Sequence, residues 1–165
     1  MKIYLLLACF FLCLPGLLQA KEKTGQKTII GATAFMEVGG VPFPMLARID
    51  TGAHNTSIHA LNVHVVNESD EPDENIGKTV TFTTTDRKGK SVNMAALIVR
   101  VSRVTNSQGT EKRYVVELPV SWHHISKKVQ VNLRDRSKMK YKLLIGRNWL
   151  SGDFLVDVDL NAEKN

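Results

Sequence analysis

Ala47-Arg48-Ile49-Asp50-Thr51-Gly52-Ala53 is the most informative segment of this sequence. A largely apolar strand delivers the Asp50 carboxylate into a tight turn, which Gly52 permits and the Thr51 hydroxyl can brace. Two carboxylates held within roughly 3 Å share one proton and activate a water between them, which is how paired aspartates hydrolyse peptide bonds. On these three residues alone, however, the stronger interpretation is an ordinary β-turn in which Asp50 caps its own backbone.

A second motif, Leu143-Leu144-Ile145-Gly146-Arg147-Asn148-Trp149-Leu150, lies about ninety residues downstream. In this order and spacing the two motifs strongly resemble retropepsins, the single-lobe aspartic peptidases of retroviral type. In retropepsins an apolar-apolar-Gly strand lies behind the catalytic loop, and Gly-Arg-Asn commonly follows it. The resemblance assigns the supporting strand and turn to Leu144, Ile145, Gly146, Arg147 and Asn148.

Three blocks in order resemble, more narrowly, a bacterial retropepsin-like family with the older label ATP-dependent zinc protease. They are Ile49 to Ala60, Asp135-Arg136-Ser137 and Phe154-Leu155-Val156-Asp157, and the resemblance covers residues 28–159. The label has little local support, because the sequence contains neither a phosphate-binding loop nor a His-Glu-x-x-His motif.

The histidines also argue against a zinc site. His54, His59 and His64 are spaced five residues apart, and a strand points such residues to alternate faces instead of gathering three ligands. A site made of His59 and a distant histidine pair, His123-His124, is the minor alternative. We therefore expect no metal and no cofactor.

The resemblance implies that Asp50 is the catalytic carboxylate and that Thr51, Gly52 and Ala53 shape its loop. The sequence contains one Asp-Thr-Gly and no Asp-Ser-Gly. A peptidase would therefore need the second Asp50 from another copy of the chain, across a two-fold axis. In retroviral enzymes an acidic residue soon after the first motif pairs with the arginine of the second. Here the motif is followed by His54, which offers no carboxylate. The sequence therefore departs from the pattern behind the retroviral dimer and substrate clamp.

The rest of the sequence predicts strands. Short runs of β-branched and apolar residues recur between turn residues, and helical periodicity is almost absent apart from one turn expected at Asn148 to Leu150. The pattern alone indicates an all-β barrel or sandwich. With the resemblance, it predicts an all-β, single-domain, retropepsin-like closed barrel with at most one short helix. The expected strands are 28–38, 41–49, 57–61, 63–66, 79–85, 91–101, 100–104, 113–120, 129–133, 142–145 and 154–158.

A peptidase of this type also needs a flap that covers the carboxylates and restricts water. By position, the candidate is the hairpin whose tip is Asp86 to Lys90. Its tip is charged and holds one glycine, so an ordinary surface hairpin is at least an equal interpretation.

The first twenty residues have the pattern of a secretory signal peptide. Met1-Lys2 is a short positive region, a mostly apolar run follows, and small Ala20 precedes polar Lys21. Cleavage after Ala20 would remove both cysteines, Cys9 and Cys13, and lower the formal net charge from +6 to +5. An uncleaved N-terminal anchor is the alternative. We expect an exported, periplasmic protein without disulfides or thiol chemistry.

These boundaries give a simple domain organisation. We expect a signal peptide at 1–20, a flexible segment at 21–27, one domain at 28–159 and a short tail at 160–165.

Basic residues gather in the second half of the chain, at Lys127-Lys128 and at Arg134, Arg136, Lys138, Lys140 and Lys142. If that stretch were extended, Arg136 and the three lysines after it would share one face. The default interpretation is a solvated face that keeps the protein soluble. The functional interpretation is a docking surface for an acidic peptide, an anionic glycan or membrane headgroups. Its candidate residues are Lys127, Lys128, Arg136, Lys138 and Lys140.

The leading hypothesis is therefore a homodimeric aspartic endopeptidase that acts on a peptide or protein substrate through Asp50. The alternative is a catalytically inactive module of the same fold that binds a peptide or a membrane-protein partner in the cell envelope. A basic protein that binds anionic polymers is a third hypothesis. Nucleic acid is not an expected partner, because a basic exported protein meets anionic envelope surfaces and not genomes.

Overall fold

The computed structural model describes residues 26–106 and 109–162. The predicted signal peptide at 1–20, most of the expected segment at 21–27 and the last three residues lie outside the described part of the chain. Within that part, no helix is long and apolar enough to cross a membrane.

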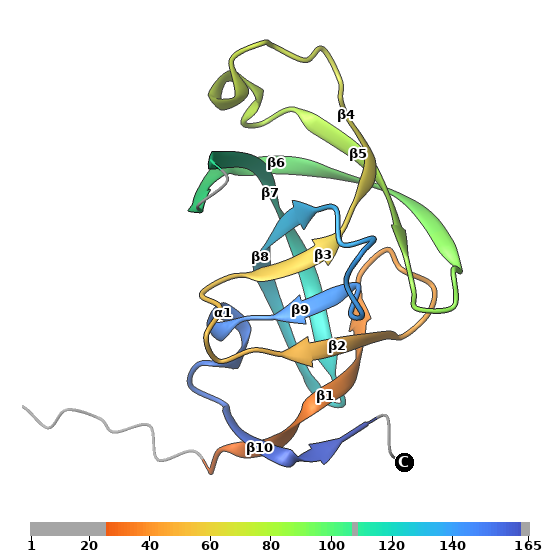
Figure 1. Cartoon of the computed structure of the whole chain (residues 1–165), viewed down its shortest axis with the longest axis vertical. Coiled ribbons are helices and arrows are strands. Elements are labelled where there is room, and N and C mark those ends of the chain that lie inside the picture. Colours follow the sequence, from red (N-terminus) through yellow and green to blue (C-terminus); the bar gives the residue numbers. More distant parts are fainter. Residues whose placement is uncertain (1–25, 107–108, 163–165) are drawn as a thin grey trace, which may run out of the picture.

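The described chain is nearly all β, as the sequence predicts, and Figure 1 shows its strands with one short α-helix. The elements in chain order are β1 (Thr28–Val38), β2 (Met45–Ile49), β3 (Thr56–His59), β4 (Leu61–Val65), the 3₁₀ helix η1 (Pro72–Asn75), β5 (Thr79–Thr85), β6 (Ser91–Asn106), β7 (Gly109–Trp122), β8 (Ile125–Arg134), β9 (Leu143–Ile145), α1 (Arg147–Leu150) and β10 (Phe154–Asn161).

Two differences from the expected strands have local causes. Residues 41–44 are not part of β2, because Pro42 and Pro44 lack the amide protons that a strand ladder needs. The two strands expected at 91–101 and 100–104 are one continuous strand, β6, which bulges between Ile98 and Arg100 where its pairing with β7 shifts register. A bulge bends a strand without ending it.

All ten strands belong to one sheet, in the order β10-β1-β2-β9-β3-β8-β7-β6-β5-β4. β1 also pairs with β7, through Glu37 opposite Ser121 and Val38 opposite Val120. The strand pairings therefore run in a ring from β1 through β2, β9, β3, β8 and β7 back to β1. β10 lies outside this ring on one side, and β6, β5 and β4 extend from it on the other.

Short β9 places the two sequence motifs together. It runs parallel to β2, with Ile49 opposite Ile145, and antiparallel to β3, with Ser57 opposite Leu144. β2 and β9 therefore end side by side, at the side of the molecule where α1 lies (Figure 1). The residues that follow these ends, Asp50 and Gly146, leave the sheet at the same edge.

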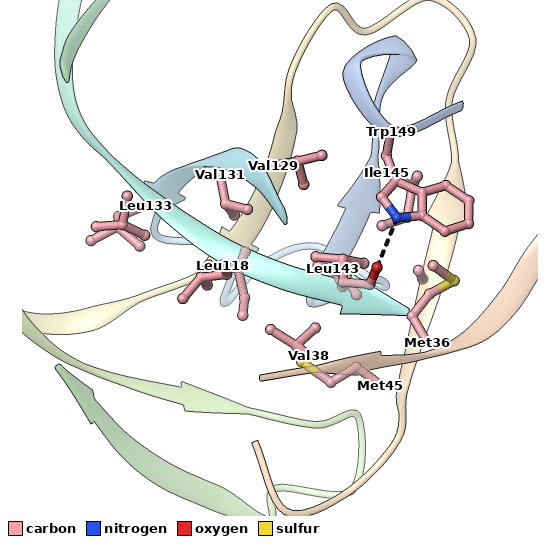
Figure 2. Packing of buried hydrophobic residues seen from close by; sticks show 14 of the residues in the cluster. Met36, Val38, Met45, Leu118, Val129, Val131, Leu133, Leu143, Ile145 and Trp149 are labelled. Atoms are coloured by element: carbon pink, nitrogen blue, oxygen red, sulfur yellow. Dashed lines mark hydrogen bonds between the residues drawn. The ribbon is translucent and has the colours of Figure 1, made fainter. Parts of the chain in front are cut away.

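The core lies beneath this edge and is apolar. Figure 2 shows Trp149 packed beside Ile145 and Met36, with its indole Nε1 donating a hydrogen bond to the Val120 carbonyl at 2.9 Å. Trp149 is fully buried and stacks on the Phe154 ring, with the ring centroids 4.5 Å apart. The tryptophan anchors α1 to the core, so the turn that begins at Gly146 has a defined position.

Candidate active site

The Asp50 carboxylate is held by its own loop. Its Oδ1 atom accepts hydrogen bonds from the amides of Gly52 at 2.9 Å and Ala53 at 3.1 Å. The Asp50 amide donates to the Ile145 carbonyl at 2.9 Å, which fixes the loop to the end of β9. Within the described residues Oδ2 makes no hydrogen bond to protein. One oxygen therefore orients the group, as the β-turn interpretation predicts, and the other is left to act on a ligand or a water.

Gly146 lies directly behind this loop. A Cβ atom at this position would lie 2.6 Å from the Asn55 carbonyl carbon and 3.0 Å from the Thr56 amide nitrogen. These are backbone atoms, which cannot turn aside as a flexible side chain can. Glycine is therefore required for the chain to pack this closely against the Asn55 and Thr56 backbone.

Asn148 joins three segments around the same point. Its Oδ1 atom accepts hydrogen bonds from the Thr56 amide at 2.9 Å and the Thr56 hydroxyl at 2.8 Å, while its Nδ2 donates to the Gln130 carbonyl at 2.8 Å. The Thr56 hydroxyl in turn accepts from the Gly146 amide at 3.3 Å. Sequence reasoning did not single out Thr56, although it lies six residues after Asp50, because its role appears only when α1 packs against β3.

Arg147 holds the Asp50 loop through backbone carbonyls and not through a carboxylate. One guanidinium nitrogen, Nη1, donates to the carbonyls of Thr51 and Gly52, each at 2.9 Å. The Arg147 amide donates to the Ala53 carbonyl at 2.9 Å. The acidic partner that His54 cannot supply is therefore replaced by two carbonyls of the loop itself.

A hollow of about 290 Å³ opens at Asp50. It is lined by Ala32, Arg48, Ile49, Asp50, Thr51, Val156 and Val158. Thr51 and Arg48 are exposed there, and Asp50 is half-buried. Val156 and Val158 come from β10, and no sequence pattern indicated that this strand borders the site. Of the remaining predicted residues, Leu144 is half-buried on β9, opposite Arg48 of β2.

The expected basic face is not formed. Residues 135–142 form turns instead of an extended segment, so the side chains do not alternate along one surface. Arg136 is only 6% exposed, and its Nε donates to the Tyr141 carbonyl at 3.0 Å. Lys142 Nζ donates to the carbonyls of Arg136, Ser137 and Met139 at 2.8 to 3.2 Å.

The other basic residues differ in their surroundings. Lys127 pairs with Asp153, and Lys128 pairs with Glu117 at 3.0 Å. Lys138 and Lys140 are exposed. Of the five residues proposed from sequence as a docking surface, Arg136 is buried, and Lys127 and Lys128 form ion pairs.

Arg136 is a buried cation whose charge interacts with the Asp50 carboxylate. Burial lowers the pKa of Arg136 from its ordinary value, the positive charges of Arg134 and Arg113 lower it further, and the Asp50 carboxylate opposes them. Arg136 makes no ion pair within the described residues. A buried cation among like charges is unfavourable by itself and becomes favourable when an anion enters. Sequence reasoning treated Arg136 as a surface residue, because its burial depends on contacts far away along the chain.

The structure does not place the flap candidate over Asp50. The tip residues Asp86, Arg87 and Lys88 line a separate hollow of about 280 Å³ together with Phe35, Pro44 and Leu46. Figure 1 shows this hairpin, between β5 and β6, on the opposite side of the molecule from the ends of β2 and β9. Within one chain, the described residues leave Asp50 open.

The described residues contain no group of three His, Cys, Asp or Glu side chains arranged to hold a metal ion. His54 Nδ1 lies 3.0 Å from Asn55 Oδ1, and His59 Nδ1 accepts a hydrogen bond from the Arg136 amide at 2.9 Å. These two histidines thus have hydrogen-bond partners of their own.

Comparison with known proteins gives a family match over most of the chain. The model of the RimB-like family, described as retropepsin-like aspartic endopeptidase RimB, matches residues 38–164. This segment includes both motifs, the Asp-Arg-Ser block and β10.

Curated relatives are more distant and longer. The chain is 29% identical over 137 residues to a probable alpha-L-glutamate ligase of Shewanella pealeana, which covers 80% of this chain and 29% of the relative. It is 28% identical to a probable alpha-L-glutamate ligase of Parasynechococcus marenigrum, with 80% and 28% covered. The chain thus spans less than a third of the length of these relatives.

A solved structure has the same fold. It is the crystal structure of a protein of unknown function from Legionella pneumophila, which matches with a TM-score of 0.66 and 26% identity. The match covers 82% of this chain and 97% of that protein.

Proposed function

Given that this chain belongs to the RimB-like family of retropepsin-like aspartic endopeptidases, we propose that it hydrolyses peptide bonds with a water activated by two Asp50 carboxylates. The observation that carries the proposal is the Asp50 loop. Its Oδ1 is held by the amides of Gly52 and Ala53, and its Oδ2 is left unbonded by protein at an open hollow. This arrangement orients a carboxylate and leaves it free to take or give a proton.

The second carboxylate comes from a second copy of the chain. The sequence contains a single Asp-Thr-Gly, and two carboxylates must share one proton for one to act as base and the other as acid. A two-fold axis beside Thr51 supplies them symmetrically. The ring of pairings that joins β1 to β7 supports the closed barrel expected for such a protomer.

We place the active protein outside the cytoplasm, in the periplasm. The support is the sequence of residues 1–20, with a short positive start, an apolar run and small Ala20 before Lys21. Amino-terminal sequencing of the exported protein should begin at Lys21, and a protein that retains residues 1–20 would contradict the cleavage.

For the substrate, we propose peptides with acidic side chains. Arg136 is buried near Asp50 among Arg134 and Arg113 without a carboxylate partner in the described residues. Arg113 pairs with Glu111 through one nitrogen, yet its Nε is buried without a hydrogen-bond partner. The curated relatives are named for ligating glutamate, a chemistry whose products carry carboxylates. Comparing the rates at which acidic and neutral peptides of equal length are cleaved tests this preference.

Asp50→Asn tests the catalytic role. Asparagine keeps an oxygen for the Gly52 and Ala53 amides but cannot exchange a proton, so the fold should persist while hydrolysis falls by about a thousandfold or more. The assay is mass spectrometry of a peptide library incubated from pH 4 to 8, with Asp70→Asn as the matched control on an exposed loop. Equal cleavage by wild type and Asp50→Asn would reject the site.

A mixing experiment tests the shared dyad. Wild type and Asp50→Asn are co-expressed at known ratios, and the rate of hydrolysis is measured against the wild-type fraction. If each site needs two Asp50 carboxylates, the rate follows the square of that fraction. A linear dependence would show that one chain acts alone.

One observation favours the non-catalytic module: the hairpin tip with Asp86 lies away from Asp50, and none of the described residues of one chain covers the site as a flap. Such a module would bind a peptide or a membrane-protein partner without cleaving it. If folded wild type cleaves no peptide at any pH, this function replaces the peptidase. An anionic-surface binder has lost support, because Arg136 is buried and Lys127 and Lys128 are paired.

A further inference from the structure

β4 is the edge strand at the end of the sheet order opposite β10, and it pairs only with β5 among the described strands. One side of its backbone is therefore open within the described sheet. Leu61 is 36% exposed, Val63 43% and Val66, just beyond the strand, 46%. Natural sheets usually shorten, charge or cover such edges, because an open edge with apolar side chains pairs readily with another extended chain.

A hollow of about 570 Å³ continues from this edge across β5 and β6. Its lining is free of charged side chains and consists of Asn62, Thr81, Phe82, Thr83, Asn93, Met94 and Ala95. The Thr83 hydroxyl donates a hydrogen bond to Asn93 Oδ1 at 2.8 Å, and Asn62 Nδ2 donates to the Thr83 hydroxyl at 3.4 Å. Side chains thus join the three strands on this face, so the surface is formed before any partner arrives.

The chain that follows β4 is acidic, although the whole protein has a formal net charge of +6. Glu68, Glu71 and Glu74 are exposed and make no ion pair within the described residues. Glu68 is the third residue after β4 ends. Residues 67–77 contain no lysine or arginine. Negative charge is therefore concentrated at the end of the open edge.

The three glutamates are carried by a loop that is held in place. Asn75 is fully buried, its Nδ2 donates to the Ser69 carbonyl at 2.9 Å, and its Oδ1 accepts from the Ser69 amide at 2.8 Å. Lys78 Nζ also donates to Asn75 Oδ1, at 2.9 Å, and Asp73 pairs with Arg103. Because these contacts fix the loop, the glutamates keep their place beside β4.

We propose that β4 adds a strand from another protein, an extended segment with lysine or arginine at the end that lies beside Glu68, Glu71 and Glu74. Main-chain hydrogen bonds to the open edge supply affinity, and attraction to the glutamates selects a basic segment. The hairpin tip at the other end of β5 carries Arg87 and Lys88. The positive residues of the partner therefore belong at the glutamate end alone.

This docking edge is separate from the Asp50 site. No residue of β4 lines the hollow at Asp50, and Figure 1 shows β4 and β10 at opposite ends of the molecule. A segment paired with β4 thus leaves the Asp50 carboxylate open. The inference concerns a bound partner and goes beyond the proposed hydrolysis, on which it does not depend.

An NMR titration is the main test. The probe is a short synthetic peptide that begins with lysines and continues with alternating threonine and valine. It is added to isotope-labelled protein expressed from the full coding sequence, and it should bind with a dissociation constant below about 1 mM. Amide shifts should concentrate in β4 and at the three glutamates, with β10 as the control edge. Shifts confined to β10, or no binding at about 1 mM peptide, would overturn the proposal.

Two matched peptides separate strand pairing from charge. The first has glutamates in place of the lysines, and the second keeps the lysines but is N-methylated on alternate amides, which removes the donors that pair with β4. Each should bind at least about tenfold more weakly than the parent peptide. Equal binding of the N-methylated peptide would rule out strand addition, and equal binding of the glutamate peptide would rule out selection by charge.

Protein variants test the glutamates directly. The double change Glu68→Gln and Glu71→Gln should weaken binding of the lysine peptide by about threefold or more and reduce its dependence on salt. The matched control is Glu37→Gln, an exposed glutamate on β1, which should bind like wild type. The NMR spectrum of each variant reports that the fold is kept. An unchanged affinity in the double variant, or an equal loss in the control, would contradict the proposal.

Two further observations distinguish other occupants of the edge. If the β4 amide shifts change with protein concentration when no peptide is present, a second copy of this chain occupies the edge and the proposal fails. Mass spectrometry of the peptide after the titration should find it intact. A peptide that is cut, with shifts at the Asp50 loop instead of β4, is a substrate, which would reject the docking edge and support the proposed hydrolysis.

Discussion

The two ends of β9 are held in place by different physical means. At the Ile145 end, Gly146 and Asn148 join the Asp50 loop by close backbone packing and neutral hydrogen bonds. At the Leu143 end, the chain is fixed by charged or titratable groups: Lys142 binds three carbonyls, and His59, on β3, is buried beside Arg136.

The Ile145 end of β9 depends mainly on close packing, whereas the Leu143 end depends on charged or titratable groups. Burial lowers the pKa of His59 below its ordinary value of 6.5, and the positive charges of Lys142 and Arg136 lower it further against the opposing charge of Asp135. The hydrogen bonds of Asn148 to Thr56 and Gln130 join neutral groups. These bonds should therefore persist over a wide range of pH, while the Leu143 end responds to acid.

Gly146→Ala should disrupt the Ile145 end of β9 and have the largest effect on stability. The new Cβ would lie 2.6 Å from the Asn55 backbone, so the loop must move. The free energy of unfolding should fall by about 3 kcal/mol or more. Urea denaturation measures the loss. The exposed Ser151→Ala, just beyond α1, is the control and should change stability by less than about 0.5 kcal/mol. An unchanged midpoint in Gly146→Ala would contradict the packing argument.

Asn148→Ala should cost somewhat less. It leaves the Thr56 amide and hydroxyl without their acceptor and the Gln130 carbonyl without its donor, a loss of about 2 to 3 kcal/mol. Asn148→Asp keeps the acceptor for Thr56 but sets a carboxylate oxygen against the Gln130 carbonyl, so it should also lose stability. Either variant with wild-type stability would contradict the role given to these bonds.

Lys142→Met tests the contribution of the charged groups at the Leu143 end of β9. Methionine keeps much of the side-chain volume but releases the carbonyls of Arg136, Ser137 and Met139, which should cost about 1 to 2 kcal/mol. The same change removes a positive charge that lowers the pKa of His59, so stability should also vary less with pH. Denaturation at pH 5 and at pH 7.5 measures both effects.

The smallest expected effect is the change in pH dependence when His59, which is buried, is replaced in His59→Asn. Because the pKa of His59 is lower in the folded than in the unfolded protein, the unfolded chain takes up the proton first, and stability falls as pH drops below about 6.5. Asparagine can still accept the Arg136 amide but does not titrate, so its curve should be flatter between pH 7 and pH 5. Parallel curves for the two proteins would assign the acid response to other groups.

Much of the site could be predicted from the sequence because it depends on local patterns. Alternating burial along Thr79–Thr85 is a property of any strand with one buried face. The Asp50 loop and the turn that starts α1 follow from neighbours within a few residues of each motif, whereas the need for glycine at Gly146 comes from the backbone of Asn55 and Thr56, far away in the chain.

Other features depend on which distant segments meet. The burial of Arg136, the position of the Asp86 hairpin away from Asp50 and the presence of β10 beside the hollow were absent from the sequence-based interpretation. Each depends on strand order and register, which bring together residues about fifty to one hundred positions apart.

The sequence by itself determined the strands and the Asp50 turn, since these require only local backbone geometry and a period of two along each strand. The tertiary structure alone decided which charges are buried, where the hairpin lies and which edge stays open beside Asp50, because burial and exposure are set by contacts between segments far apart in the chain.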